Sequence, residues 1–129
     1  MFINLKGVRW SMLDSTVEVL ASWNEGCIHK NINIRNILID SNIRAKIGNF
    51  NLAKETDTSG TTWELVGTTG YMAPEYVEAG SVTSKMDIYA FGVVLLELVT
   101  KKDVIVEESG EILLSAAVAE NNGRRKCSN

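Results

Sequence analysis

The chain has 129 residues, which is the size of one small domain and leaves no room for two hydrophobic cores. Hydrophobic residues make up 45% and charged residues 22%, so the composition excludes a disordered or collagen-like chain. Thirteen basic residues against sixteen acidic ones give a net charge of −3, without the basic excess of nucleic-acid-binding proteins. We therefore expect no nucleic acid among its partners.

The cysteine content and the apolar stretches indicate the compartment. Cys27 and Cys127 are the only cysteines, too few for the disulfide framework of a small secreted domain. The most apolar stretch, 89–99, contains Gly92 and Glu97 and is shorter than the ~20 residues of a membrane-spanning helix. The first residues lack the apolar run of a signal peptide. We expect this chain by itself to be cytoplasmic, with no membrane span.

The predicted elements begin with an amphipathic helix over 10–24, where large apolar residues recur every three or four positions. Short β-prone runs follow at 27–28, 37–39 and 45–47, and the polar residues between the last two predict a hairpin. Residues 31–36 contain three asparagines, which favour turns, and predict an exposed loop.

The second half of the chain predicts a long loop followed by a helix. Residues 55–69 are dominated by Thr, Ser, Gly and Asp and predict a flexible segment, with three apolar anchors: Trp63, Leu65 and Val66. Residues 86–100 are apolar on every side of a helix, which predicts burial on all faces. A short apolar segment at 112–119 then precedes a polar end. These patterns predict a mostly helical fragment with one small β-hairpin.

Four short motifs occur in a fixed order along the chain. They are His29-Lys30-Asn31-Ile32 with Asn36, then Asn49-Phe50-Asn51, then Ala73-Pro74-Glu75, and finally Asp87 at the start of the apolar helix. This order and spacing resemble the protein-kinase signature set, in which H-R-D-L-x-x-x-N, D-F-G and A-P-E follow one another in the C-terminal lobe.

Longer segments of the sequence restrict the resemblance to one group of protein kinases. The sequences of 67–76 and 87–97 resemble plant receptor-like kinases of the Ser/Thr type. Within that group, 28–31 and 45–50 look most like lysin-motif receptor-like kinases with a degenerate kinase domain. The resemblance implies an α+β, protein-kinase-like fold, of which residues 10–118 match a partial C-terminal lobe and 119–129 form a polar tail. The Gly-rich loop and the lysine that hold ATP in this family have no match before residue 10.

The matched catalytic positions depart from the family pattern. Asn31 stands where the family has the aspartate that accepts the hydrogen bond of the substrate hydroxyl, and Asn33 stands where Ser/Thr kinases have a lysine. An amide cannot take a proton, so general-base assistance of about 10²–10⁴-fold is lost. The resemblance therefore implies degenerate catalytic positions.

The resemblance also implies ATP and Mg²⁺ as cofactors, at positions matched by Asn36 and Asn49. Asn36 is the residue that the family has, whereas Asn49 replaces a metal-binding aspartate. Mg²⁺ prefers anionic oxygen, so only weak metal binding is expected, and binding of ATP by this chain is doubtful. Asn51 replaces a glycine, and asparagine tolerates the positive φ that this turn of the family uses.

Other matched positions are structural or lie in the activation segment. Thr68, Ala73, Pro74 and Glu75 belong to the activation segment by resemblance. His29, the only histidine, is expected to pack under that segment rather than to act as a base or a metal ligand. Asp87 is expected to bind the backbone of the loop at 29–31.

Together these observations predict a fragment of a protein kinase domain, whose parent activity is ATP-dependent phosphorylation of Ser or Thr. We expect an inactive pseudokinase that binds a partner receptor kinase at the cytoplasmic side of the plasma membrane in the full-length parent. Two alternatives stay open: a weakly active Ser/Thr kinase when full length, and a truncated gene product without function. The isolated chain is expected to fold poorly, because its apolar helix needs cover on all sides.

Overall fold

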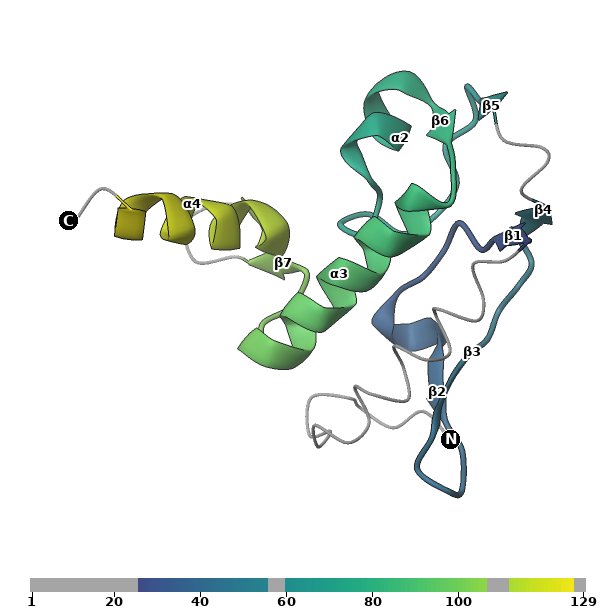
Figure 1. Cartoon of the computed structure of the whole chain (residues 1–129), viewed down its shortest axis with the longest axis horizontal. Coiled ribbons are helices and arrows are strands. Elements are labelled where there is room, and N and C mark those ends of the chain that lie inside the picture. Colours follow the sequence, from purple (N-terminus) through teal and green to yellow (C-terminus); the bar gives the residue numbers. More distant parts are fainter. Residues whose placement is uncertain (1–25, 56–59, 107–111, 127–129) are drawn as a thin grey trace.

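A computed structural model describes residues 26–55, 60–106 and 112–126 (Figure 1). The helix expected over 10–24 lies outside these residues. Within the described ranges, three α-helices and a short 3-10 helix alternate with four antiparallel strand pairs. The longest helix, α3 (Lys85–Thr100), runs through the middle, and the other elements are arranged around it.

The strand pairs are short, and one of them was expected. Strands β2 (Ile37–Ile39) and β3 (Ala45–Ile47) pair with Ile37 opposite Ile47, which confirms the hairpin. Three further antiparallel pairs join two-residue strands: β1 (Cys27–Ile28) with β4 (Lys54–Glu55), β5 (Gly60–Thr61) with β6 (Ser81–Val82), and β7 (Ile105–Val106) with β8 (Ile112–Leu113). Two residues are too few to show a period of their own.

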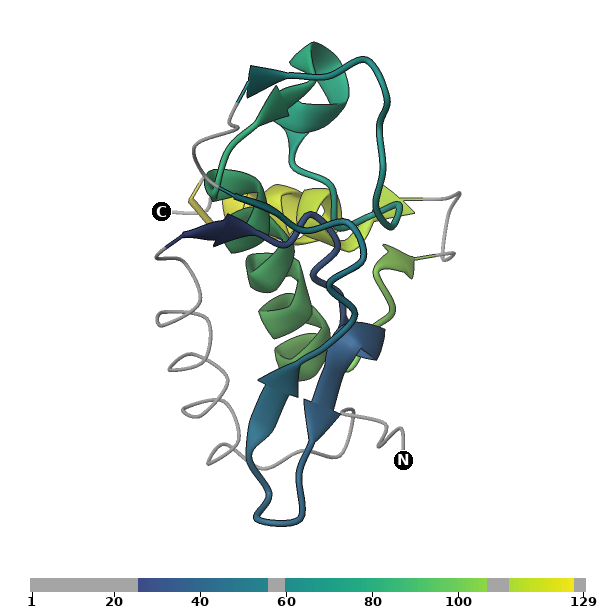
Figure 2. The same ribbon diagram turned by 90° about the vertical axis from the view of Figure 1, so that its right-hand side faces the viewer.

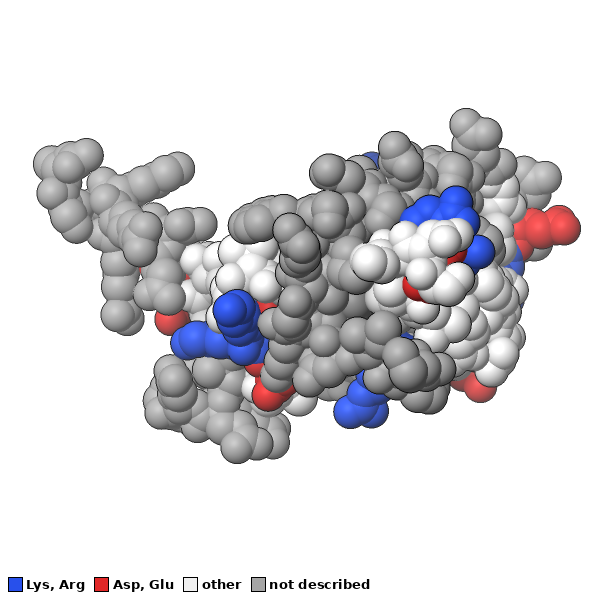
Figure 3. Space-filling model, turned by 90° about the horizontal axis from the view of Figure 1, so that it is seen from below, with Lys and Arg blue, Asp and Glu red and all other residues white. Residues whose placement is uncertain are grey.

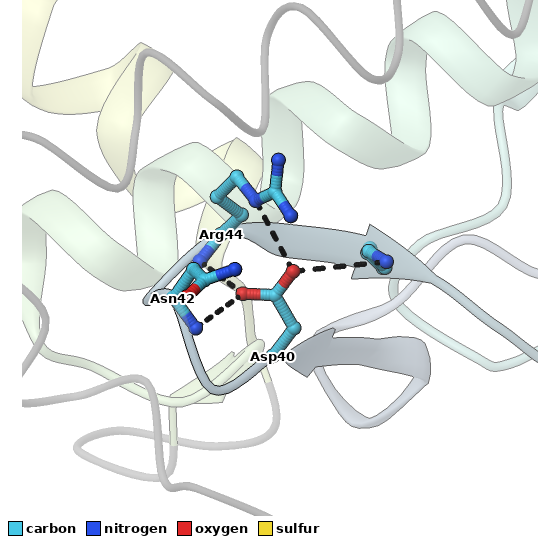
Figure 4. Close-up of polar contacts among 4 residues, drawn as sticks. Asp40, Asn42 and Arg44 are labelled. Atoms are coloured by element: carbon cyan, nitrogen blue, oxygen red, sulfur yellow. Dashed lines mark hydrogen bonds and ion pairs between the residues drawn. The ribbon is translucent and has the colours of Figure 1, made fainter.

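The turn of the hairpin is organised by Asp40 (Figure 4). Its Oδ1 accepts hydrogen bonds from the backbone N–H groups of Asn42 and Arg44, each at 2.9 Å. Its Oδ2 forms ion pairs with Arg44 Nε at 3.2 Å and Lys46 Nζ at 3.6 Å. The Arg44 backbone N–H, followed by the Asn42 N–H and the Arg44 side chain, lowers the pKa of Asp40. Aspartate favours turns for this reason, since its side chain replaces a backbone acceptor.

The buried residues form two hydrophobic cores, not the single core that the chain length led us to expect, and both include residues of α3. One joins α3 to the hairpin and to the loop before it: Ile32, Ile37, Ala45, Tyr71, Ala90, Phe91, Val93 and Val94. The other joins the start of α3 to β1, β6 and α2 (Pro74–Ala79): Ile28, Ala73, Tyr76, Val82 and Met86. The expected helix is confirmed, but burial on all its faces is wrong, because Ile88 is 51% and Val99 is 60% exposed. The packed elements cover only part of its circumference.

The last helix, α4 (Leu114–Lys126), packs against α3 and runs through most of the segment expected as a polar tail. Leu114 is buried, and Tyr89 Oη donates a hydrogen bond to Ser115 Oγ at 3.3 Å. None of the helices in 26–55, 60–106 and 112–126 has the length and apolarity to cross a membrane.

Candidate functional site

The loop after β1 is largely buried. His29, Lys30, Ile32 and Asn33 are all buried, so the expectation of an exposed loop at 31–36 is wrong for its first half. Ile32 belongs to the core that includes α3. The chain then enters a 3-10 helix, η2 (Ile34–Asn36), whose start is capped by Asn33 Oδ1 accepting from the Arg35 N–H at 3.0 Å. Asparagine is a preferred residue for this capping position.

Asp87, in the first turn of α3, holds this loop. Its Oδ2 accepts the His29 backbone N–H at 2.7 Å, and its Oδ1 accepts the Lys30 N–H at 3.0 Å. Burial raises the pKa of Asp87, and the two backbone N–H groups oppose that rise. Lys30 has φ of 69°, in the left-handed region, so the loop turns sharply at this point. The carboxylate thus satisfies two N–H groups that would otherwise be buried without acceptors.

The His29 ring is held on both sides. Its Nδ1 accepts the Asn31 backbone N–H at 3.2 Å, so Nε2 carries the proton and donates to Gly48 O at 2.9 Å. The ring also makes an edge contact with Phe50, with centroids 5.0 Å apart. With both nitrogens occupied, the ring links the loop to the turn that carries Asn49.

Four asparagines meet beside this loop, and we call them the asparagine cluster: Asn31, Asn33, Asn36 and Asn49. Asn31 Oδ1 is its centre, because it accepts from Thr68 Oγ1 at 2.6 Å and from Asn33 Nδ2 at 3.1 Å. Asn33 Nδ2 also lies 3.1 Å from Asn31 O and 3.3 Å from Thr68 Oγ1. The structure therefore brings the two expected catalytic positions into contact with the activation segment.

The two expected metal positions are paired with each other. Asn36 Nδ2 donates to Asn31 O at 2.8 Å, and Asn49 Nδ2 donates to Asn36 Oδ1 at 3.3 Å. The positive φ of this turn, 61°, lies at Asn49 and not at Asn51 as the sequence led us to expect. The turn places the amide of Asn49 against that of Asn36.

The donor set does not fit Mg²⁺. The Asn36 oxygen already accepts an amide N–H, and both side chains are neutral. Mg²⁺ demands near-ideal octahedral geometry and is bound through carboxylates. In the part of the chain that the structure describes, no three His, Cys, Asp or Glu side chains gather where they could hold a metal.

The segment that the resemblance assigns as the activation segment contacts the asparagine cluster through Thr68. Thr68 is exposed, Ala73 is buried, and Pro74 starts α2 with Glu75 exposed in its first turn. Sequence reasoning missed the contact of Tyr71 Oη with Glu97 Oε2 at 2.5 Å, which is buried. Burial and the neighbouring Glu97 raise the pKa of Tyr71. A glutamate inside the apolar run of α3 was the available signal, because buried carboxylates need partners.

A cavity of about 720 Å³ lies beside this contact. Its walls come from η2, from the activation segment near Thr68 and Tyr71, and from residues 101–105 after α3. Glu97 forms part of its lining. The cavity is lined by Asn33, a member of the asparagine cluster, and by Thr68, which contacts Asn31 and Asn33, so the cavity and the cluster are adjacent.

Comparison with known proteins gives the family and several relatives. Residues 9–126 match the family model of the protein kinase domain. Protein LYK5 of Arabidopsis thaliana is 50% identical over 82 residues, which cover 60% of this chain and 12% of that protein. LysM domain receptor-like kinase 3 of Medicago truncatula is 46% identical over 98 residues, 74% of this chain and 15% of that protein.

A third relative is chitin elicitor receptor kinase 1 of Physcomitrium patens, 44% identical over 98 residues, which cover 76% of this chain and 14% of that protein. The chain thus spans 12 to 15% of the length of these three relatives. The expected resemblance to lysin-motif receptor-like kinases is confirmed.

Proposed function

The chain belongs to the protein kinase domain family, and on that premise we propose that it is a catalytically inactive member that acts by binding another protein. Its activity, cofactors and partners are proposals, since it spans only 12 to 15% of the relatives' length. The family's own reaction is the ATP-dependent transfer of a phosphoryl group to a protein hydroxyl. The proposal is that the chain has lost this transfer reaction and that the surface of its domain binds another protein.

One observation carries the loss of transfer: the neutral amide of Asn31 stands at the centre of the site. Its oxygen accepts from Thr68 and Asn33, and it has no lone pair basic enough to take a proton. Without a base, about 10²–10⁴-fold of rate is absent. Asn33 adds no positive charge that would stabilise a transferring phosphate.

The second support is the pairing of Asn36 with Asn49. A metal ion would have to break this amide contact and would gain no anionic ligand from either residue. Since the family positions ATP through Mg²⁺, weak metal binding also weakens nucleotide placement. We therefore propose that neither ATP nor Mg²⁺ takes part in the function of this chain.

A transfer assay tests the loss of activity. The purified chain is incubated with radiolabelled ATP, Mg²⁺ or Mn²⁺ and a generic protein substrate, beside an Asn36→Ala control. We expect equal background labelling in both samples. Labelling by the unmodified chain above the control would overturn the proposal, and would favour the alternative of weak kinase activity that retains Asn36.

The partner is proposed to be a receptor kinase at the cytoplasmic side of the plasma membrane. Support comes from the names of the relatives, which include receptor-like kinases. Biolayer interferometry of this chain against purified kinase domains of the Arabidopsis and Medicago relatives is the test. We expect saturable binding, and failure to bind either domain would overturn this role and favour a product without function.

A further inference from the structure

Trp63 is the most exposed large apolar side chain among the described residues. It is 98% exposed, so the expectation that it anchors its segment in the core is wrong. Tryptophan carries a large apolar area, and full exposure of that area is costly in water. Exposed tryptophans are enriched at protein interfaces, where they supply much of the binding energy.

The backbone that carries Trp63 is fixed at both ends. On one side, the Thr62 N–H donates to Gly80 O at 2.9 Å, immediately after α2. On the other side, the Val66 N–H donates to Tyr76 Oη at 2.8 Å, and Tyr76 is buried. The segment between these bonds therefore runs along α2 in the antiparallel sense.

Further exposed apolar side chains lie on the same two segments. Leu65 is 43% exposed and Val77, on α2, is 49% exposed. We call Trp63, Leu65 and Val77, with the exposed carboxylates of their sequence neighbours Glu64 and Glu78, the tryptophan surface. Figures 1 and 2 show α2, β5 and β6 together at the end of the molecule opposite the turn of the β2–β3 hairpin.

The two segments that carry this surface are acidic, although Lys30, from the loop after β1, interacts electrostatically with Glu64. Residues 60–84 contain no Lys, Arg or His but three acidic residues: Glu64, Glu75 and Glu78. The face seen from below differs, because there Lys and Arg lie next to Asp and Glu over the described residues (Figure 3). A partner that covers the tryptophan surface therefore gains from basic residues of its own.

We propose that the tryptophan surface is a docking site for a partner protein that offers an apolar pocket for Trp63, rimmed by Lys or Arg. This inference rests on the proposed function and names the surface that it uses. The acidic charge argues against a second copy of this chain in a symmetric contact, because like charges would face each other. It also argues against a membrane, since the cytoplasmic leaflet is anionic.

The first test uses the relatives' kinase domains as binding partners in interferometry. Trp63→Ala is expected to weaken binding at least about tenfold, as removal of an interface hot spot does. Glu64→Gln with Glu78→Gln is expected to slow association and to reduce its dependence on salt. Val99→Ala, which truncates an exposed apolar residue on α3, is the matched control and should bind as the unmodified chain does.

The second test does not depend on those domains. It compares a series of short fluorescent peptides that all have leucines at the same positions. The positions between the leucines are Lys, Gln or Glu. Fluorescence anisotropy measures the binding of each peptide to the whole chain. The Lys peptide is expected to bind most tightly, with at least about a tenfold loss for Trp63→Ala. Urea midpoints equal to that of the unmodified chain show that Trp63→Ala is folded.

The outcomes separate this inference from the proposed function. If the kinase domains bind but Trp63→Ala binds equally well, the docking site is wrong and the proposed function stands. If no kinase domain binds, the proposed receptor-kinase partner is wrong, and the peptide series alone tests whether the tryptophan surface is a docking site. Equal binding of the Lys and Glu peptides, or no binding of any peptide, would then overturn the docking site.

Discussion

Asp87 is the single residue on which the geometry of the candidate site depends most. Asp87→Asn leaves one side-chain acceptor where two buried N–H groups, of His29 and Lys30, need one each. A buried donor without a partner costs about 1–3 kcal/mol, so we expect a loss of that size in the free energy of unfolding in urea. Glu78→Gln neutralises an exposed carboxylate and serves as the control. Equal midpoints for the two variants would contradict the role given to Asp87.

We expect the side chain at position 49 to determine how strongly the site binds a divalent cation. Asn49→Asp removes the amide N–H that Asn36 Oδ1 now accepts and adds an anionic oxygen beside it. We expect Mn²⁺ to broaden the NMR signal of the Asn36 side-chain amide at much lower concentration in this variant than in the unmodified chain, because the new carboxylate provides the ligand type that divalent cations prefer. The same broadening in both proteins would show that the amide pair does not hinder the metal.

The sequence predicted the residues of the candidate site better than it predicted the contacts between them. The residues of the asparagine cluster, Thr68 and Asp87 were expected from the resemblance of the motifs to the protein-kinase signature set. The contact between Tyr71 and Glu97 joins residues 26 positions apart and belongs to none of those motifs. Sequence patterns mark a residue by its neighbours in the chain, so a hydrogen bond between two distant elements leaves little trace.

Gly80 shows how closely α2 and the segment beside it are packed. It ends α2 with φ of 61°, and an added Cβ would lie 2.0 Å from Thr62 O, a backbone atom that cannot move aside alone. Gly80→Ala is expected to cost at least the roughly 1–2 kcal/mol of left-handed strain, with the clash in addition. Urea denaturation of the variant should show a large fall in midpoint.

Gly92 is the matched control within α3. A Cβ added there meets nothing within 4 Å, and glycine inside a helix is about 0.8–1.0 kcal/mol less favourable than alanine. Gly92→Ala should therefore raise the urea midpoint while Gly80→Ala lowers it. Shifts of the same sign would show that the close approach at Gly80 is not real.

The β2–β3 hairpin is expected to weaken in acid because of Asp40. A carboxylate whose pKa is lowered in the folded state stabilises that state above its unfolded pKa of about 3.9, and the stabilisation is lost as the pH falls through the lowered pKa. NMR signals of β2 and β3 should report local unfolding in that range. Asp40→Asn should remove this dependence, and an unchanged acid transition in the variant would contradict it.

The elements with a strong pattern of their own were predicted, and so was the β-prone run at 27–28 that forms β1, whereas the pairing of distant segments was not. The apolar run of α3 and the polar turn of the hairpin carry their signals within a few residues. β1 and β4 pair across more than twenty residues, and two-residue strands have no alternation to read. The three asparagines of 31–36 predicted an exposed loop, but its first half is buried because Ile32 belongs to the core that includes α3.

At the scale of the whole molecule, α3 connects all parts of the candidate site. Its first turn holds the buried loop through Asp87, and its last turns present Glu97 to Tyr71 and to the cavity. The same helix contributes to both hydrophobic cores. A change that loosens α3 should therefore disturb the asparagine cluster and the cavity together.

One side of α3 is only partly covered by other elements. We expect this exposed side to make the isolated chain associate in solution. Ile88, Gly92, Leu95 and Val99 follow the spacing of one helix face, and the first and last of them are 51% and 60% exposed. Leu95 packs against the core around Phe91, so the exposed large apolar side chains of this face are Ile88 and Val99, and exposed apolar area promotes association in water. We expect analytical ultracentrifugation of the chain to show concentration-dependent oligomers, with binding of a hydrophobic dye and a shallow urea transition.

The double variant Ile88→Gln, Val99→Gln tests whether this face is the cause. Both positions are exposed and glutamine suits a helix, so the variant should keep its fold while it loses most of the association and the dye binding. Trp63→Gln provides the comparison, since it removes an exposed apolar side chain that is not on α3. A monomer that excludes the dye and melts cooperatively without any substitution would show that the described cores suffice, because the exposed face of α3 would then carry no measurable penalty.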